Sequence, residues 1–517
     1  MAASAATLAF AWQPGITAIT SDEVSYVALA RLFVSGEPWG RHLATFPPLF
    51  PLLLAGTGAA YDLTVAHVVV AVFAALALPL VYWHASRVLG SAGAGLAVVA
   101  AFLLTPSAWL AAKPIGSEPA FLVATLAALC LLEARAGASA RDRWVLGLAL
   151  AAAVSLRTAG FALVAAYAAN VLIDARKARR APDARAAIPI VLAIVAAAAW
   201  IALRPLEGRD LYAINVSAFA HRWLADPAGT FVEAARALGG GWIATFALDS
   251  TAPVFVAAGA LAAGALALAG TWMRVAANRV DGWYVVFSIA VLAPMYFGEQ
   301  TARRYLHPLL PVLLVHAAVA LGALTARMNP RARAGVLAAA FVLPAAVCAT
   351  SLATIATRAA DRAPVLEGFT IRWSDLIDYY IVRDEARARE SAAANAGVLA
   401  GFDAVDRATP PGARVMWMRP EYVAVLARRP AAAWFYADDE ARLARAIESQ
   451  AVDYVALSGI VKSDLDARQG DQAAVARALA RFASPVVEIP NAVQGRPEFV
   501  LLKVDREAVR AYLASRA

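Results

Sequence analysis

The chain has 517 residues, of which 61% are hydrophobic and only 16% are charged. Its mean hydropathy of +0.62 excludes an ordinary water-soluble protein. The formal net charge of +8 is also compatible with a nucleic-acid partner, but its distribution along the chain points to another explanation.

Long apolar runs recur down to about residue 355, and most approach the length needed to cross a hydrocarbon core. We therefore predict a polytopic α-helical membrane protein with about eleven transmembrane helices. The first run contains Pro14 and has no basic residue before it, so it does not resemble a cleaved signal peptide, and we expect its helix to begin before Met1. The predicted spans are residues 4–20, 62–83, 91–110, 118–134, 143–155, 158–174, 186–203, 251–271, 283–298, 305–324 and 334–355.

The Lys and Arg residues between the spans predict the orientation in the membrane. With the N-terminus in the cytoplasm, the short cytoplasmic turns carry fourteen basic residues, and the loops on the opposite face, apart from residues 204–250 and the C-terminal region, carry six. This bias places residues 21–61, residues 204–250 and the C-terminal region outside the cytoplasm of a cell (inner) membrane. Basic turns facing anionic lipid explain much of the net charge, so we predict no nucleic-acid partner.

The composition changes near residue 358, which predicts a membrane domain over 1–357 and an extracytoplasmic α/β domain over 358–517. Short apolar runs alternate with helical stretches there, a pattern typical of a mostly parallel sheet. The predicted strands lie at 414–418, 431–436, 452–458, 485–489 and 498–504, and the predicted helices at 420–429, 438–450 and 471–482. No phosphate-binding glycine loop opens any of these helices, so we expect a stabilising or docking role for this domain.

Ionisable side chains near the ends of membrane helices are costly and therefore informative. Three such clusters fall on the predicted external face. They contain Asp22, Glu23 and Tyr26; Lys113, Ser117 and Glu118; and Glu299, Arg303, Arg304, Tyr305 and His307. A catalytic pocket at a membrane surface requires carboxylates and cations at the same depth. In these clusters, separate helices would contribute them.

Each cluster also has a structural interpretation. Arg303 fits an interfacial anchor, and His307, before Pro308, fits a structural residue better than a catalytic one. Glu118 could simply be an acidic residue that the helix dipole favours at a helix N-terminus. Lys113 fits an interfacial anchor and a site residue equally well. For Asp22 and Glu23 we favour a functional role over a solvated loop, because Tyr26 and the other clusters agree with it.

At these residues the chain resembles the C-type (GT-C) membrane glycosyltransferases, in particular protein O-mannosyltransferases and the bacterial aminoarabinose transferase that modifies lipid A. The stretch "DEVSY" (22–26) resembles their Asp-Glu-x-x-Tyr signature, and "FPPLFPLLLA" (46–55) their proline-containing interface helix. "GSEPAF" (116–121) lies where family members carry a second acidic residue, and "RRYLHPLLP" (303–311) resembles their Arg-Tyr-Leu-x-Pro stretch. The tail resembles the external α/β domain of many bacterial members.

The resemblance implies a hexosyl- or pentosyltransferase that moves a sugar from a polyprenyl-phosphate donor to a hydroxyl of a lipid, cell-wall glycan or protein outside the cytoplasm. It assigns the catalytic base to Asp22, and we expect Glu23 to orient the acceptor or Tyr26. Arg304 and Lys113 suit the donor phosphate.

Substrate-binding roles remain for Tyr26, Glu118, Glu299 and Tyr305. The spacing supports no dedicated metal site, although Glu118 and Glu299 leave room for a divalent cation. A direct displacement with one base implies inversion at the anomeric carbon.

Two rival functions remain open. A transporter or flippase needs ionisable groups near the bilayer midplane and helices broken there, and Pro106, Pro253 and Pro294 are compatible with such breaks. A non-catalytic assembly subunit would use its tail to bind a partner. The position of the charged clusters at span ends favours the enzyme.

Overall fold

The fold is described from a computed structural model, which covers residues 6, 9–11, 15–19, 22–37, 43–133, 139–204, 211–293, 298–433, 440–459 and 479–516. The chain forms two compact units. The first contains Met1–Pro14, His42–Thr357 and Tyr380–Arg383, and the second contains Gly15–Arg41, Arg358–Tyr379 and Asp384–Ala517. Residues 15–41, which we expected to belong to the membrane part, therefore pack with the C-terminal part of the chain.

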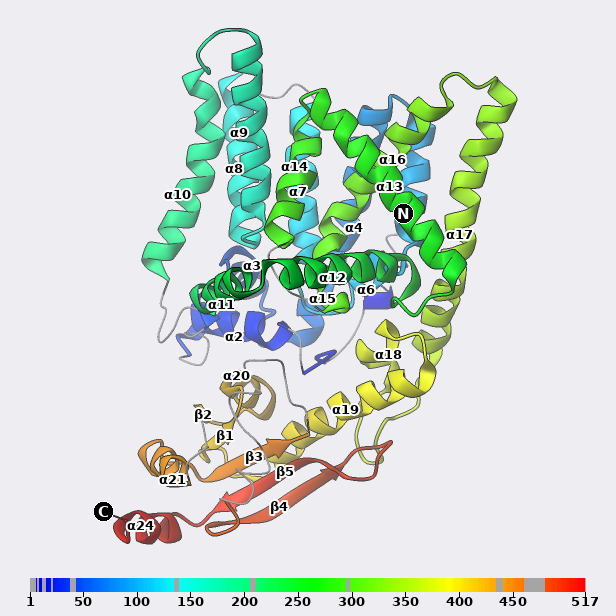
Figure 1. The fold of residues 1–517 in the computed structure, drawn as a ribbon. Coiled ribbons are helices and arrows are strands. Elements are labelled where there is room, and N and C mark those ends of the chain that lie inside the picture. Colours follow the sequence, from blue (N-terminus) through cyan, green and yellow to red (C-terminus); the bar gives the residue numbers. More distant parts are fainter. Residues whose placement is uncertain are drawn as a thin grey trace. The chain divides into compact units, whose positions relative to one another are not determined.

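The first unit is helical, and helices lie at each predicted span between residues 62 and 355 (Figure 1). They are α4 (Leu63–Leu89), α5 (Ala92–Leu104), α7 (Glu118–Glu133), α8 (Ala140–Leu156), α9 (Gly160–Lys177), α10 (Ile188–Leu203), α13 (Val254–Ala276), α14 (Val280–Leu292), α16 (Leu310–Thr325) and α17 (Pro330–Ala360). Among the described residues, four helical segments are long and apolar enough to cross a membrane: Leu63–Leu89, Ala184–Leu203, Val254–Ala276 and Glu299–Thr325. The expected number of about eleven spans is not confirmed, and the first predicted span lies largely outside the described residues.

Short helices fill the segments between these long ones. Thr105 is extended and Pro106 cannot continue a helix, so the predicted span 91–110 divides into α5 and α6 (Pro106–Leu110). The predicted interface helix is α3 (Leu49–Gly56), which is too short to cross a membrane. The segment 204–250 was expected as a loop, but its described residues form α11 (Leu211–Ala225) and α12 (Pro227–Ala247).

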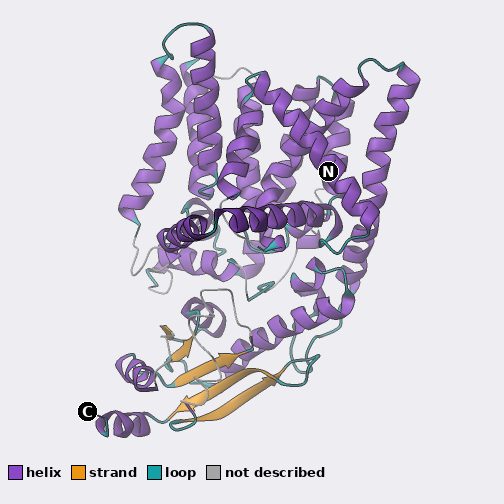
Figure 2. Ribbon diagram, viewed as in Figure 1, coloured by secondary structure: helices purple, strands orange, loops and turns teal. Residues whose placement is uncertain are grey.

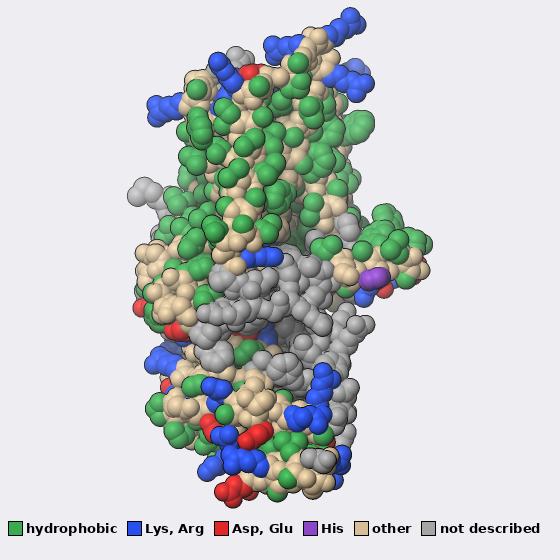
Figure 3. Space-filling view, turned by 90° about the vertical axis from the view of Figure 1, so that its left-hand side faces the viewer, with side chains coloured by type: hydrophobic (Ala, Val, Ile, Leu, Met, Phe, Trp, Pro, Cys, Tyr) green, Lys and Arg blue, Asp and Glu red, His purple; other side chains and the backbone are tan. Residues whose placement is uncertain are grey.

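The two ends of the first unit differ in character. The turns that join α4 to α5, α9 to α10, α13 to α14 and α16 to α17 lie at one end, and α12 runs across the other end (Figure 1). Lys and Arg side chains gather at the first of these ends, and an apolar surface covers the helices below it (Figure 3). Helix α10 contributes to this surface, because only 11% of the most apolar stretch of Ala184–Leu203 is buried inside the protein. A broad apolar belt beside a basic rim is the pattern of a membrane-embedded protein.

A buried polar network ties helices together near the basic end. Arg274 of α13 donates from Nε to both carboxylate oxygens of Asp281, at 3.0 and 2.9 Å, and pairs with Glu133 of α7 at 2.5 Å. The Nε2 atom of His316 on α16 lies 3.1 Å from Asp281 Oδ2. Because Asp281 and His316 are almost fully buried, these contacts offset the cost of removing the charged groups from water.

The second unit contains all the described strands of the chain (Figure 2). They are β1 (Val415–Trp417), β2 (Ala431–Ala433), β3 (Tyr454–Ser458), β4 (Ala483–Pro490) and β5 (Pro497–Val504), in the order β2-β1-β3-β5-β4. All five predicted strands are confirmed where described. The expectation of a mostly parallel sheet is wrong for half of the pairs, because β5 runs antiparallel to both β3 and β4.

Helices cover both faces of this sheet. Helix α19 (Glu385–Ala408) packs on β4 and β5, and its Phe402 ring meets Phe499 of β5 and Trp417 of β1. Helices α21 (Glu440–Ser449) and α24 (Arg506–Ala514) enclose a second apolar core that includes Met416 of β1. Successive side chains point to opposite faces of a strand, so Met416 and its neighbour Trp417 enter different cores. The predicted helix at 471–482 lies mostly outside the described residues, and the sequence interpretation missed α19 and α24.

Residues 15–19 are held by buried polar contacts. The Ile19 backbone N–H donates to Asn395 Oδ1 on α19 at 2.8 Å, and the Ile377 N–H donates to the Thr17 carbonyl at 3.0 Å. Asn395 Nδ2 in turn donates to Asp378 Oδ2 at 3.0 Å. Although Ser391 donates to the same carboxyl, burial raises the pKa of Asp378 to about 6.

Gly401 is expected to be essential for the packing of α19. A Cβ atom there would lie 2.2 Å from Cγ of the buried Phe499 ring. We expect Gly401→Ala to lower the midpoint of thermal unfolding, because overpacking costs about 1–3 kcal/mol and helix propensity returns at most about 1 kcal/mol. Gly412→Ala is the control, since no atom lies within 4 Å of its added Cβ. Equal midpoints for both variants would contradict this packing.

Asp378 should make stability pH-dependent. Its folded pKa of about 6 exceeds the ordinary value of about 4, so the folded chain binds more protons than the unfolded chain between these pH values. The contribution of Asp378 to stability is therefore present below about pH 4 and lost as the pH rises through about 6. We expect Asp378→Asn to flatten the dependence of the unfolding midpoint on pH across this window. The same slope in wild type and variant would exclude this role.

Candidate active site

The sequence-predicted site residues fall in both compact units. Lys113, Glu118, Glu299, Arg304 and Tyr305 belong to the first unit. Asp22, Glu23 and Tyr26 belong to the second. Each group is described within its own unit.

Glu118 is the centre of an ion cluster in the first unit. It begins α7, and its side chain is only 3% exposed. Its Oε1 atom accepts a hydrogen bond from Arg304 Nε on α15 (Glu299–Leu306) and one from Arg157 Nη1 at 2.7 Å. Arg157 also donates to Ser117 Oγ at 3.1 Å. Helix α15 packs on α12 at the end of the unit opposite its basic turns (Figure 1). One carboxylate thus fixes a guanidinium group of this helix together with that of Arg157.

An apolar pocket opens beside this cluster, and we call it the Arg157 pocket. Arg157, Tyr284, Ser288 and Tyr305 contribute its polar groups, and the Arg157 guanidinium lies 5.0 Å from the centre of the Tyr305 ring. Its apolar lining includes Phe121 of α7, Leu292 of α14 and Leu309. An apolar wall next to fixed cations suits an amphiphilic anion better than a free sugar.

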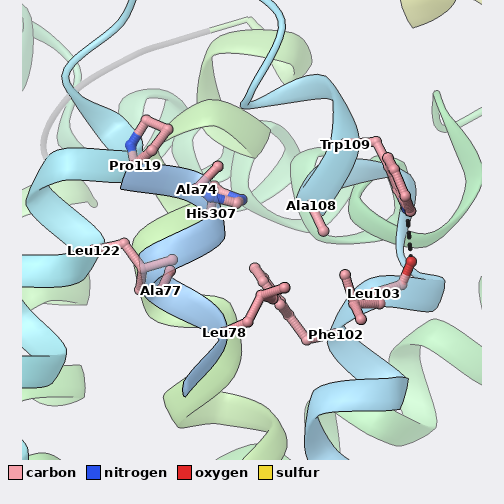
Figure 4. Close-up of a pocket in the computed structure, with 10 residues that line it drawn as sticks. All are labelled: Ala74, Ala77, Leu78, Phe102, Leu103, Ala108, Trp109, Pro119, Leu122 and His307. Atoms are coloured by element: carbon pink, nitrogen blue, oxygen red, sulfur yellow. Dashed lines mark hydrogen bonds between the residues drawn. The ribbon is translucent and has the colours of Figure 1, made fainter. Parts of the chain in front are cut away.

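A second pocket, the His307 pocket, is also lined by residues from the start of α7. Figure 4 shows His307 with Pro119 and Leu122 of α7 and with Phe102 of α5. The His307 ring is buried, and its Nδ1 atom lies 3.5 Å from Ser107 Oγ. These surroundings agree with the structural interpretation of His307 from the sequence.

Lys113 and Glu299 have defined surroundings in the same unit. Lys113 is a buried residue, and its ammonium lies over two aromatic rings, 4.8 Å from the centre of Tyr380 and 5.2 Å from that of Phe10. Glu299 accepts hydrogen bonds from the backbone N–H of Ser250, at 2.7 Å, and from its hydroxyl. Glu299 therefore holds the turn that follows α12.

Asp22, Glu23 and Tyr26 lie at the start of α2 (Glu23–Ser35) in the second unit. Asp22 precedes the helix as its N-cap residue, and its side chain makes no capping hydrogen bond. Glu23 is buried and accepts a hydrogen bond from the Thr17 N–H at 3.2 Å and another from the Thr17 hydroxyl. The buried Tyr26 donates its backbone N–H to the Asp22 carbonyl at 3.0 Å, which confirms that it lies one helical turn further on.

The C-terminal residues reach the same helix. Arg419 Nη2 donates to Ser25 Oγ at 2.9 Å, and Arg31 Nη1 donates to the Ala424 carbonyl at 3.3 Å. Arg419 directly precedes α20 (Pro420–Tyr422), and Ala424 lies in the short π-helix Val423–Ala427 that follows it. We call the C-terminal part of the second unit, Asp384–Ala517, the α/β unit. Its residues thus support the start of α2.

The sequence analysis missed two arginines near the candidate site residues: Arg157, which contacts Glu118, and Arg419, which contacts Ser25 in the helix that follows Asp22. Arg157 was counted only as an external charge, although it interrupts the apolar stretch between two adjacent predicted spans. Arg419 begins the "RPEY" stretch, which was interpreted as a helix and as part of a domain resemblance. Across the described ranges, no three His, Cys, Asp or Glu side chains come together as a metal site.

Comparison with known proteins relates this arrangement to a known fold. No family model and no curated protein sequence matches the chain. ArnT from Cupriavidus metallidurans bound to undecaprenyl phosphate is similar in structure, with a TM-score of 0.55, 16% identity and coverage of 97% of this chain and 96% of ArnT. Its apo state gives a TM-score of 0.54, 14% identity and coverage of 98% and 97%.

A third solved structure extends the similarity. The archaeal oligosaccharyltransferase AglB from Archaeoglobus fulgidus, in complex with an inhibitory peptide and a dolichol-phosphate, gives a TM-score of 0.53 and 12% identity. The alignment covers 96% of this chain and 74% of AglB. Both relatives are C-type glycosyltransferases. The chain therefore has the fold of the C-type membrane glycosyltransferases, as its sequence motifs predicted.

Proposed function

We propose that the chain is a glycosyltransferase that moves a sugar from a polyprenyl-phosphate donor to a hydroxyl of an acceptor outside the cytoplasm. The observation that carries this proposal is the Arg157 pocket, in which apolar walls adjoin the guanidinium group of Arg157, and Glu118 links this group to Arg304. The fold supports it, because similar structures hold undecaprenyl phosphate and dolichol-phosphate. The basic turns at the opposite end of the first unit favour a cytoplasmic location for that end of the unit.

The donor binds through two kinds of contact in this proposal. Its isoprenoid chain lies against the apolar lining of the Arg157 pocket, and its phosphate lies at Arg157 and Arg304. Glu118 orients both guanidinium groups, as their shared hydrogen bonds support. Lys113 is a further phosphate-binding candidate, and Tyr305 helps to position the phosphate by holding Arg157. Arginine suits this role because its planar fork matches phosphate oxygens.

The reaction is a direct displacement at the anomeric carbon. The acceptor oxygen forms a bond to this carbon, the bond from the carbon to the phosphate oxygen breaks, and Asp22 takes the hydroxyl proton. The polyprenyl phosphate leaves with the bonding electrons, and the arginines stabilise its growing negative charge. Such a step inverts the anomeric centre. Glu23 and Tyr26 shape the acceptor side, and Glu299 is a candidate for sugar hydroxyls.

Removal of the base should abolish transfer while leaving the fold intact. We expect Asp22→Asn to lower transfer by roughly 10²- to 10⁴-fold, the usual contribution of a general base. The measurement is mass spectrometry of surface glycans and lipid-linked sugars in a deletion strain that expresses wild type or variant. Without active enzyme, a polyprenyl-phosphate sugar should accumulate.

Glu37→Gln, beyond the other end of α2, is the matched control and should restore the glycan fully. Full restoration by Asp22→Asn would exclude Asp22 as the base. No accumulated lipid-linked sugar in the deletion strain would contradict the donor class.

Arg304→Ala should mainly impair use of the donor. Hydrogen bonds to charged groups contribute about 1.5–3 kcal/mol, so we expect kcat/KM for the donor to fall roughly 10- to 100-fold. The KM for the acceptor should not change. Kinetics with the lipid-linked sugar extracted from the deletion strain provide the measurement, and Arg279→Ala, exposed at the basic end, is the control. A change confined to the acceptor KM would disprove the phosphate role.

A further inference from the structure

Arg419 connects the α/β unit to the helix that follows Asp22. It lies between β1 and α20, and its Nη2 atom donates to Ser25 Oγ at 2.9 Å. Ser25 is fully buried in the first turn of α2, three positions after Asp22. A guanidinium group from the C-terminal part of the chain is thus fixed at the first turn of the helix that carries the proposed base.

The Arg419 side chain is itself held firmly by its own loop. Its Nε atom donates to Glu421 Oε1 at 2.8 Å, and its guanidinium lies 4.7 Å from the centre of the Tyr422 ring. Glu421 and Tyr422 are both at least 98% buried. Because these contacts restrict a long and otherwise flexible side chain, its positive charge has a defined position relative to α2.

The charges around Arg419 include the proposed base. Burial alone would lower the pKa of Arg419, but Tyr422, Glu421 and Asp22 together raise it above its ordinary range. Electrostatic interaction is mutual, so a cation that Asp22 stabilises also favours the carboxylate form of Asp22. A general base must be in this form before it can accept a proton.

We propose that Arg419 is a positioning residue for Asp22, which fixes the first turn of α2 through Ser25 and keeps Asp22 ionised. This inference rests on the proposed function, in which Asp22 is the base. It gives the α/β unit a part in the reaction beyond the stabilising or docking role expected from sequence. A purely structural Arg419 would affect stability without affecting the protonation of Asp22.

Infrared difference spectroscopy of the full-length protein tests the charge effect without a substrate. Acidification produces a carboxylic acid band for each protonated Asp or Glu, and the band that disappears in Asp22→Asn belongs to Asp22. We expect Arg419→Gln to move the midpoint of this band upward by about one pH unit, because the carboxylate loses its neighbouring cation. Arg419→Lys keeps the charge and should keep the midpoint near that of the wild type.

Arg429→Gln provides the matched control. Arg429 is a buried arginine of the same unit that donates to Asp406 Oδ1 and Thr409 Oγ1 at the end of α19. Its loss should reduce stability but leave the Asp22 midpoint unchanged. A wild-type midpoint in Arg419→Gln would overturn the charge effect.

Transfer assays separate the positioning effect from the charge effect. With the lipid-linked sugar extracted from the deletion strain as donor, we expect Arg419→Lys to lower kcat about tenfold or more, because an ammonium group cannot reproduce the hydrogen bond to Ser25 and the pairing with Glu421 together. Wild-type kcat in this variant would overturn the positioning effect, and this variant remains informative if Arg419→Gln does not fold. The proposed function fails separately, through wild-type transfer by Asp22→Asn.

Discussion

The pairing of Glu118 with Arg157 and Arg304 is the interaction on which the candidate site depends. A carboxylate that is almost fully buried at the end of an apolar helix unit is costly unless cations compensate it. Its two partners come from segments about forty and nearly two hundred residues further along the chain. One charge requirement therefore fixes where the end of α8 and the last turn of α15 must meet the start of α7, and it places the Arg157 guanidinium beside an apolar pocket.

The same requirement operates at the other end of the first unit. Asp281 is matched there by Arg274 and His316 on neighbouring helices. This network is internally paired and lies near the basic turns, whereas the Glu118 cluster adjoins a pocket. Similar electrostatics thus serve two purposes: the first network joins helices, and the second also orients cations next to a cavity. The difference lies in the cavity, which is why composition alone cannot separate a structural ion pair from a site.

In the second unit, long-range contacts support the short acidic segment that contains Asp22 and Glu23. Residues 15–19 are tied to α19 through Asn395, and α2 is tied to the start of α20 and to the π-helix after it through Arg419 and Arg31. These hydrogen bonds link positions almost four hundred residues apart. The proposed base Asp22 requires rigid surroundings, and these hydrogen bonds hold the segments on both sides of it. The α/β unit therefore supports the acidic segment in addition to forming a sheet with its own apolar core.

The sequence by itself determined the membrane class, the position of most helices, the strands of the tail and the fold family. The length of apolar runs, the alternation of apolar and polar residues and short motifs are local properties, so they can be recognised in the sequence alone. Only the tertiary structure decided that β5 pairs antiparallel, that residues 15–41 join the C-terminal unit, and that Arg157 and Arg419 support the candidate residues. Strand direction and ion pairing depend on contacts between distant segments, and the free energy of burying a charge is set by neighbours that no local pattern specifies.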